Sequence, residues 1–290
     1  MSTLPLSGSS ASAGLVTDVI EFSVVDGPGN RFVVFLQGCN FDCLACHNPY
    51  TIKECIDCGI CLDVCTTGAL TMVADRVVWT ESLCTGTDAC IAACPYDSTP
   101  KARPQAVADV MARIRRASGF LSGVTVSGGE ATQQAGFVHA LFSAVKAEFP
   151  RLTCFVDSNG AADVAVWDGL DDVMDAAMID LKCLDDALHV QLTGKSNREV
   201  LSSIELLAKR GKLYEVRLLL MAGLNDSDEL LAQTGRWLAG IDPTMRIKVI
   251  GYRAHGVRPS ALPLVEPTAA QREHYADVLR AEAPFDLLVI

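Results

Sequence analysis

The cysteines are the residues of this chain whose types and spacing most clearly indicate chemistry. Ten of the twelve lie between Cys39 and Cys94. The first block is Cys39-x3-Cys43-x2-Cys46, the second is Cys55-x2-Cys58-x2-Cys61-x3-Cys65, and the third is Cys84-x5-Cys90-x3-Cys94. Short runs of this kind are typical of iron–sulfur ligation, so the spacing predicts that these sulfurs bind clusters.

The first block supplies three thiolates, at Cys39, Cys43 and Cys46. Three thiolates can hold three corners of a four-iron cubane, which leaves the fourth iron without a protein ligand. An iron with an open position is a reactive site, just as an open position on zinc marks a catalytic centre. A structural zinc is the alternative, and this spacing disfavours it.

The second and third blocks follow the bacterial ferredoxin pattern, in which the last cysteine of a run ligates the other cluster of a pair. One cluster would take Cys55, Cys58, Cys61 and Cys94, and the other would take Cys65, Cys84 and Cys90. The second cluster lacks a cysteine at position 87, where Thr87 stands. Three alternatives remain: a three-iron cluster, a four-iron cluster completed by Asp88 or water, or a degraded site. Electron transfer is the role we expect for the insert, because clusters that are fully or nearly fully ligated are suited to carrying electrons rather than to binding a substrate.

Strand-like and helix-like patterns alternate from about residue 101 onward, and these elements would position the cysteine blocks. Strand-like runs cover residues 124–126, 152–156, 176–181, 216–221 and 247–250, and helix candidates cover 133–148, 164–169, 197–209, 228–239 and 269–281. A further helical pattern begins at Val107, with Pro104 near its start, and an earlier strand, Arg31–Leu36, leads into Cys39. This alternation predicts parallel strands with crossover helices, in an incomplete α/β barrel or a doubly wound sheet.

The chain divides into three regions by composition. Residues 1–14 are Ser-, Ala- and Gly-rich and are expected to form a flexible tail. Residues 15–51 and 101–290 form the α/β region, and residues 52–100 form a small insert with a hairpin within 69–80. Cys154 and Cys183 lie on or just after apolar strands, and we expect both to be small buried residues.

The overall composition narrows the functional classes. Half of the 290 residues are hydrophobic, and 24 Lys and Arg face 35 Asp and Glu, giving a formal net charge of −11. The charge argues against a nucleic-acid partner. No apolar run reaches the length of a membrane span, and we recognise no signal peptide. A cysteine-rich chain of this kind is expected to be a cytoplasmic metalloprotein, because disulfides are disfavoured there.

Polar residues follow several of the predicted strands. Ser127-Gly128-Gly129-Glu130 ends one strand, Asp157-Ser158 ends the next, and Asp180 and Lys182 follow a third, while Arg217 lies inside a β pattern. Each could be an ordinary turn or surface pair. In an α/β barrel, however, the carboxyl ends of the strands meet at one mouth, so polar residues there indicate function.

The stretch VVDGPGNRFVVFLQGCNFDCLACHNP resembles the opening of radical S-adenosylmethionine (SAM) enzymes, in particular the activases of glycyl-radical enzymes such as pyruvate formate-lyase. The ferredoxin-like insert resembles that of the activases of glycerol and diol dehydratases and related lyases. The later stretches VSGGEATQQ, VDSNG, MIDLK, QLTGKSN and RGKLYEVRLLL look most like YjjW-type activases. The resemblance implies a partial (β/α)6 TIM-type barrel with an inserted domain for two clusters.

The resemblance also implies roles for the strand-end residues. It places Gly128, Gly129 and Glu130 at the amino group of SAM. It places Asp157, Ser158 and Asp180 near the SAM carboxylate, together with a candidate monovalent cation. Lys182 would bind that carboxylate, and Arg217 would point toward SAM. The family's aromatic-His pair near the last strand is altered here. Arg253 follows the tyrosine, so either Arg253 or His255 is the candidate for that contact. Ala45 replaces an aromatic residue, which would loosen packing around the adenine.

The activity implied is reductive cleavage of SAM to methionine and a 5′-deoxyadenosyl radical, which takes a hydrogen atom from a glycine of a partner enzyme. A flavodoxin or ferredoxin would donate the electron through the insert clusters, and we expect a monomer. Two alternatives differ in class: a radical SAM reaction on a small molecule or another protein, and a pure electron carrier. The Gly-Gly-Glu and Asp-Leu-Lys elements disfavour the electron carrier.

Overall fold

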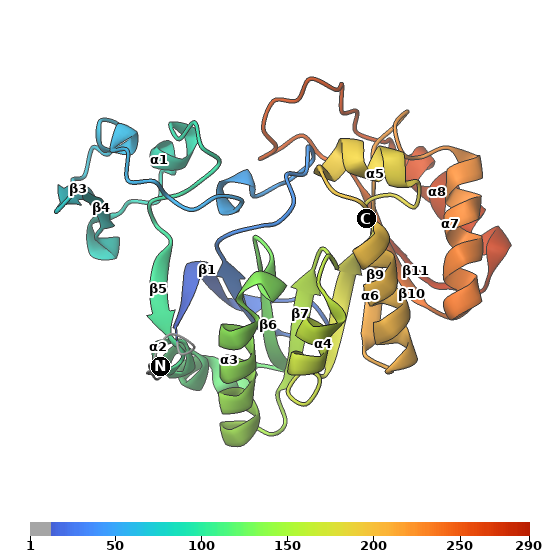
Figure 1. Ribbon diagram of the computed structural model, residues 1–290, viewed down its shortest axis with the longest axis horizontal. Coiled ribbons are helices and arrows are strands. Elements are labelled where there is room, and N and C mark those ends of the chain that lie inside the picture. Colours follow the sequence, from blue (N-terminus) through green and yellow to red (C-terminus); the bar gives the residue numbers. More distant parts are fainter. Residues whose placement is uncertain (1–12) are drawn as a thin grey trace, which may run out of the picture.

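The computed structural model describes residues 13–290 and is built around one large twisted sheet (Figure 1). Its strands are β1 (Ala13–Ser23), β2 (Arg31–Leu36), β5 (Arg103–Ala106), β6 (Gly123–Gly128), β7 (Thr153–Ser158), β8 (Ala176–Asp180), β9 (Leu213–Leu220), β10 (Arg246–Gly251) and β11 (Asp286–Val289). They lie in the order β11-β10-β9-β8-β7-β6-β2-β1-β5. All are parallel except β1, which pairs antiparallel with both β2 and β5.

The strand order decides between the two predicted architectures. The parallel strands β2, β6, β7, β8, β9, β10 and β11 lie side by side in sequence order, and only the short strand β5 lies elsewhere, beyond β1. A doubly wound parallel sheet instead reverses its order at a switch point. The sheet ends in two edges, at β5 and β11, so it is open. The predicted α/β fold with a mostly parallel sheet is therefore confirmed, and the doubly wound alternative is wrong.

Six helices were predicted at the positions where they occur. The helices of the main region are α2 (Val107–Ala117), α3 (Ala135–Glu148), α4 (Val164–Leu170), α5 (Asp186–Thr193), α6 (Arg198–Lys209), α7 (Asp228–Ile241) and α8 (Ala269–Glu282). Only α5 was not predicted. Pro104, expected at a helix start, lies instead in β5, an edge strand, where a missing N–H is tolerated. In residues 13–290, none of the helices is long and apolar enough to cross a bilayer.

The two faces of the sheet differ because successive strand residues point to opposite sides. Val126, Val156, Ile179 and Val216 are fully buried in the core with residues of the helices, such as Phe142. Each such side chain contributes roughly 1.5–3 kcal/mol by leaving water. Many of the alternate positions carry polar side chains, namely Thr125, Ser127, Asp157, Asp180, Glu215, Arg217 and Lys248, although Phe155 and Met178 also lie there. The sheet thus has an apolar face covered by helices and a polar face.

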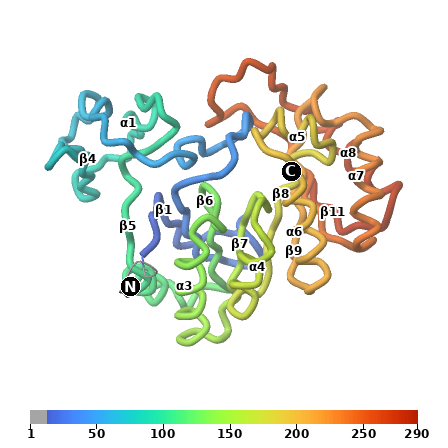
Figure 2. The backbone as a smooth tube through the Cα atoms, viewed as in Figure 1, coloured from blue at the N-terminus to red at the C-terminus, as the bar shows by residue number. Residues whose placement is uncertain are grey.

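The cysteine-rich insert stands beside the sheet, at the upper left of Figure 2. It contains the hairpin β3 (Leu70–Val73) and β4 (Arg76–Trp79) and the short helix α1 (Ala89–Ala92), with a small buried cluster around Cys61, Leu70 and Cys90. Positive φ angles at Ala74 and Asp75 fit a tight hairpin turn. The predicted hairpin is confirmed.

The predicted tail needs a correction at its end. Residues 1–12 lie outside the described part of the chain, but Ala13 and Gly14 belong to β1 and pair with Ala106 and Gln105 of β5. The strand that returns from the insert supplies a partner for these small residues, a tertiary contact that composition cannot reveal.

Candidate functional site

The first cysteine block lies in the loop that follows β2, at the carboxyl ends of the parallel strands. The Cys39 amide donates a hydrogen bond to the Ile52 carbonyl (2.9 Å). The amides of Asp42 and Leu44 donate to the carbonyls of the last two residues of α5 (both 2.9 Å). Backbone contacts on both sides therefore fix this loop against the end of the sheet, as the top of Figure 1 shows.

The three thiols of this block are partly shielded from solvent by neighbouring residues, which affects their pKa values. Burial raises the pKa of Cys39 and of Cys43 to about 12, and burial also raises the pKa of Cys46. The Phe41 amide and the Asn159 side-chain amide both donate to Cys39 Sγ, at 3.4 and 3.8 Å. Because metal ligation requires thiolates, iron binding here must release protons, and donors to sulfur favour the ligated form.

Glu130 lies at the end of β6 with a side chain that is only 1% exposed. Its Oε1 accepts hydrogen bonds from the amide and hydroxyl of Thr132 (2.9 and 2.7 Å) and from Ser158 Oγ (2.8 Å). Its Oε2 accepts one from the Asn159 amide (2.7 Å). Burial raises the pKa of Glu130. One acceptor position on Oε2 therefore remains for another donor.

The two glycines before Glu130 are required by close packing. A Cβ at Gly128, whose φ is +113°, would lie 2.1 Å from the Leu36 nitrogen, and one at Gly129 would lie 2.2 Å from the Gly38 carbonyl oxygen. Both contacts are to backbone that cannot move aside. The glycines therefore bring the end of β6 against the segment that enters the cysteine loop.

Charged residues from three neighbouring strands meet on the polar face. Lys182 Nζ contacts Asp180 Oδ2 at 2.7 Å, and Arg217 Nη1 contacts Asp157 Oδ1 at 2.8 Å. Ser127 Oγ donates to the other oxygen of Asp157 (3.0 Å). Strand register explains the grouping, because Asp180 pairs with Arg217 across β8 and β9.

The pKa values of the two aspartates of this group are shifted in opposite directions. Burial raises the pKa of Asp157, and Arg217 offsets part of that rise. Burial would also raise the pKa of Asp180, but the charges of Lys182 and then Arg217 outweigh it and the pKa is lowered. Burial opposes the charge of Lys182, yet Asp180 and then Cys43 raise its pKa. Lys182 is thus a fixed cation between an aspartate and the first cysteine block.

The sequence reading missed a second part of this charged group. Glu215 is 2% exposed and contacts three cations: Arg217 Nε at 2.9 Å, Arg246 Nε at 3.1 Å and Lys248 Nζ at 3.4 Å. Glu215 and Arg217, like Arg246 and Lys248, lie two positions apart, so each pair shares one face of its strand. That i, i+2 spacing was the available signal.

Arg253 and His255 lie in the exposed segment after β10. The segment reaches the cysteine loop, because a Cβ at Gly256 would lie 3.0 Å from the His47 carbonyl oxygen. Ala45 packs in a small apolar cluster with Tyr252 and Cys183. The structure therefore brings the predicted residues of this segment to the cysteine loop without deciding between Arg253 and His255. Cys154 and Cys183 are buried, as predicted.

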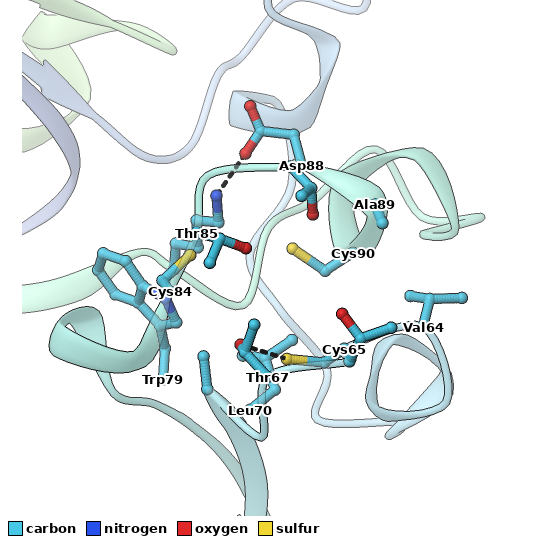
Figure 3. A pocket seen from close by; sticks show the side chains of 14 residues that line it. Val64, Cys65, Thr67, Leu70, Trp79, Cys84, Thr85, Asp88, Ala89 and Cys90 are labelled. Atoms are coloured by element: carbon cyan, nitrogen blue, oxygen red, sulfur yellow. Dashed lines mark hydrogen bonds and ion pairs between the residues drawn. The ribbon is translucent and has the colours of Figure 1, made fainter.

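The insert cysteines line two separate cavities. The first is lined by Cys55, Cys58, Cys61 and Cys94. The second is lined by Cys65, Cys84 and Cys90, whose side chains point into a common space in Figure 3. Within residues 13–290, no three His, Cys, Asp or Glu side chains converge as they would on a single metal ion. Cluster ligands are spread wider, because each thiolate binds a different iron.

Comparisons with known proteins agree with this arrangement. The family model of the radical SAM superfamily matches residues 33–234 of the chain. The chain is 34% identical over 242 residues to the (2S)-3-sulfopropanediol sulfolyase activating enzyme of Bilophila wadsworthia, covering 74% of this chain and 78% of that one. It is 30% identical over 250 residues to the pyruvate formate-lyase-activating enzyme of Streptococcus mutans, covering 84% and 79%.

A solved structure supports the fold alone. QueE from Escherichia coli superposes with a TM-score of 0.53 at 14% identity, over 96% of this chain and 94% of that one. The match to the radical SAM superfamily shows that the chain is a radical SAM enzyme. It belongs, within that superfamily, to the family of activating enzymes of glycyl-radical enzymes.

Proposed function

We propose that Cys39, Cys43 and Cys46 bind three irons of a [4Fe–4S] cluster and leave the fourth iron for SAM. The residues fit this group, because the loop is fixed at both ends and Cys39 Sγ receives two hydrogen bonds from the protein. The cluster would supply the electron that cleaves SAM into methionine and a 5′-deoxyadenosyl radical, and this radical would take a hydrogen atom from the partner's glycine.

The strand-end residues would hold the methionine part of SAM. Lys182 offers a cation to its carboxylate, beside the first cysteine block. The remaining acceptor of Glu130, with the backbone at Gly128 and Gly129, would receive the amino group. Asp157, Ser158 and Asp180 would lie near the SAM carboxylate, together with a monovalent cation. Arg217 would fix Asp157, and either Arg253 or His255 would complete the carboxylate contact.

The open sheet suggests how the partner is reached. We read it as a partial barrel, with the polar face inside and the first cysteine block at its mouth. The partner's glycine loop would enter at this mouth, so that its hydrogen lies near the reacting carbon while water is excluded. Since the protein positions the reactants and moves no proton, no acid–base pair is needed.

The insert would supply electrons. We propose a [4Fe–4S] cluster on Cys55, Cys58, Cys61 and Cys94 and a second cluster on Cys65, Cys84 and Cys90, with a flavodoxin or ferredoxin as donor. The buried hydroxyl of Ser98, which lines the first cavity, finds no hydrogen-bond partner within residues 13–290, and a cluster sulfur would provide one. We further propose a cytoplasmic monomer of the YjjW type.

The placement of three thiols beside the Lys182–Asp180 pair is the observation that carries this proposal. Replacing Cys39, Cys43 and Cys46 together by Ala should abolish SAM cleavage, measured anaerobically as 5′-deoxyadenosine released with dithionite. The matched control is Cys154→Ala, which removes a buried thiol outside the three cysteine blocks. Cleavage retained in the triple variant would contradict the assignment. Incubation of the wild-type protein with candidate glycyl-radical enzymes should then give the doublet of a glycyl radical.

A further inference from the structure

The two cavities of the insert differ in the number of cysteines that line them. The cavity on Cys55, Cys58, Cys61 and Cys94 has four thiols for the four corners of a cubane. The cavity on Cys65, Cys84 and Cys90 has three. Its other lining residues include Thr66, Thr67, Thr85, Thr87, Asp88 and Lys101. The question is whether one of these residues can take the place of the fourth thiolate.

Asp88 is the natural candidate, and its geometry argues against it. Its carboxylate is paired with Lys101 Nζ and is 60% exposed. Figure 3 shows the carboxylate directed away from the three sulfurs, and its partner is the Lys101 ammonium. Thr87 carries only a neutral hydroxyl, and Lys101 is a cation, so neither resembles the thiolates that hold iron in clusters.

The second cavity nevertheless carries signs of a bound group. The indole Nε1 of Trp79, which lines this cavity, is buried and makes no hydrogen bond to any group of residues 13–290. Buried donors are seldom left without an acceptor. Figure 3 places the indole beside Cys84, where a thiolate or a cluster sulfide would accept its proton. Thr67 Oγ1 lies 3.8 Å from Cys65 Sγ and can donate a hydrogen bond to that sulfur.

The Trp79 ring is also held in place from its faces. The Arg103 guanidinium carbon lies 4.8 Å from the ring centre, and Lys101 Nζ lies 6.0 Å from it. Such cation–π contacts restrict the ring's orientation. The indole N–H is therefore a fixed donor beside one of the three sulfurs.

We infer that the second insert cavity binds an iron–sulfur cluster through Cys65, Cys84 and Cys90 alone, with one corner that has no protein ligand. The iron at that corner is exchangeable. Oxidation by one electron converts [4Fe–4S]²⁺ into [3Fe–4S]⁺ and releases Fe²⁺, with ferricyanide as the electron acceptor. This inference deepens the proposed function, since it rests on the proposal that the insert binds clusters, but it does not require SAM cleavage.

The test must remove the first cysteine block, because a second three-thiolate site would give the same signal. We would therefore use the full chain with Cys39, Cys43 and Cys46 replaced by Ala, reconstituted with iron and sulfide. Ferricyanide oxidation should produce the paramagnetic resonance signal of an oxidised three-iron cluster, approaching one spin per chain. Iron should fall from about eight to about seven atoms per chain.

Two further substitutions in this background locate the open corner. Thr87→Cys supplies the missing thiolate and should reduce the three-iron signal at least about tenfold, with iron held at about eight per chain. Asp88→Ala should leave the signal and the iron content unchanged. The reduced signal of the four-cysteine cluster, present in every variant, reports that the insert is folded.

Several outcomes would overturn the inference. One is an oxidised protein that keeps all its iron and shows no three-iron signal. Another is a signal that first appears in Asp88→Ala, which would make Asp88 the fourth ligand. A signal unaffected by Thr87→Cys would place the open corner elsewhere. None of these results would affect the proposed function, whose failure would appear separately as an absence of SAM cleavage in the wild-type protein.

Discussion

The first cysteine block and the second insert cavity each bring three thiols together, but in different surroundings. Burial raises the pKa of all three first-block thiols. In the insert, the Gly86 amide and then the Trp79 indole lower the pKa of Cys84, although the indole falls short of hydrogen-bond geometry. The first set is half-buried at the end of a large sheet, whereas the second set, in which Cys90 is buried, lies in a small module with little core.

The charged residues beside the three cysteines also differ between the two sites. Beside the first block, Lys182 and Asp180 are largely buried and continue into the polar face of the sheet. Beside the second, Lys101 pairs with Asp88, which is mostly exposed. The number of thiolates therefore does not define the role of a three-cysteine site. The role is defined instead by the charged groups beside the site, which can bind a cosubstrate.

Replacing one cysteine in each set should separate the two roles most clearly. Cys43→Ala should abolish SAM cleavage with dithionite and with a protein donor alike. Cys90→Ala should leave the dithionite-driven rate within about twofold, because the small reductant bypasses the insert, and slow the flavodoxin- or ferredoxin-driven rate at least about tenfold. Both rates are measured as 5′-deoxyadenosine formed. Loss of the dithionite-driven rate in Cys90→Ala would show that the insert does more than deliver electrons.

The two lysines provide the next contrast. Lys182→Met removes the cation proposed to bind the SAM carboxylate, and a lost charge-assisted hydrogen bond should raise KM for SAM by roughly ten- to hundredfold. Lys101→Met, the matched change in the insert, should leave KM within about twofold. Lys182→Arg should recover only part of the loss, because its charge has a different shape.

An equal rise in KM from Lys101→Met would remove the distinction between the two sites. Thermal unfolding of both variants shows whether the fold is intact. This control matters for Lys182→Met, which leaves Asp180 without its nearest cation.

The pH dependence of the metal-free protein should also differ between the two sets. A thiol whose pKa is raised in the folded state stabilises the fold below its unfolded pKa, and that contribution is lost as pH rises toward the folded value. For Cys39 and Cys43 the free energy of unfolding should therefore fall from about pH 8.5 toward about pH 12. The decline should be of the order of 1 kcal/mol per pH unit, reduced by partial solvation.

Urea unfolding at a series of alkaline pH values measures this decline. Cys39→Ala/Cys43→Ala should flatten it. Cys84→Ala should not, because the pKa of Cys84 is lowered and its contribution has the opposite sign. A decline equally steep in the double variant would assign the effect to other groups.

The central fold was predictable because each inner strand is a short apolar run that helices cover. The strands β1, β5 and β11 were not. Buried Val16 and Val19 of β1 alternate with solvent-facing residues and follow a Ser-rich stretch. Both β5 and β11 have four residues and lie at sheet edges, where little burial marks them in the sequence. Their existence depends on pairing with a neighbour.

The site was predictable where the motif is local and not where it depends on strand register. The cysteine spacings and the Gly-Gly-Glu turn can be read along the chain. The contacts of Glu215 with Arg246 and Lys248 require β9 and β10 to pair in one register. Arg258 is a stronger case, since its partners Asp42 and Asp97 lie more than a hundred residues away.

Arg258 supplies the smallest predicted effect, at the junction between the two regions. Its Nη1 contacts Asp97 Oδ2 at 2.6 Å, its Nη2 contacts the Cys43 carbonyl at 3.3 Å, and it also pairs with Asp42. Asp97 follows Cys94 by three residues, so this side chain connects the first cysteine block to the first insert cavity. Arg258→Ala should slow the flavodoxin- or ferredoxin-driven rate by roughly three- to tenfold, the cost of one partly exposed ion-pair group.

The dithionite-driven rate should change by less than about twofold in Arg258→Ala, because the thiols and the Lys182–Asp180 pair remain in place. Arg258→Lys keeps the charge but loses the planar fork that reaches three partners, and should give an intermediate rate. Equal slowing with both donors would mean that Arg258 holds the cysteine loop itself. Slowing with the protein donor alone would mean that it sets the placement of the insert, which is the feature that separates the two three-cysteine sites.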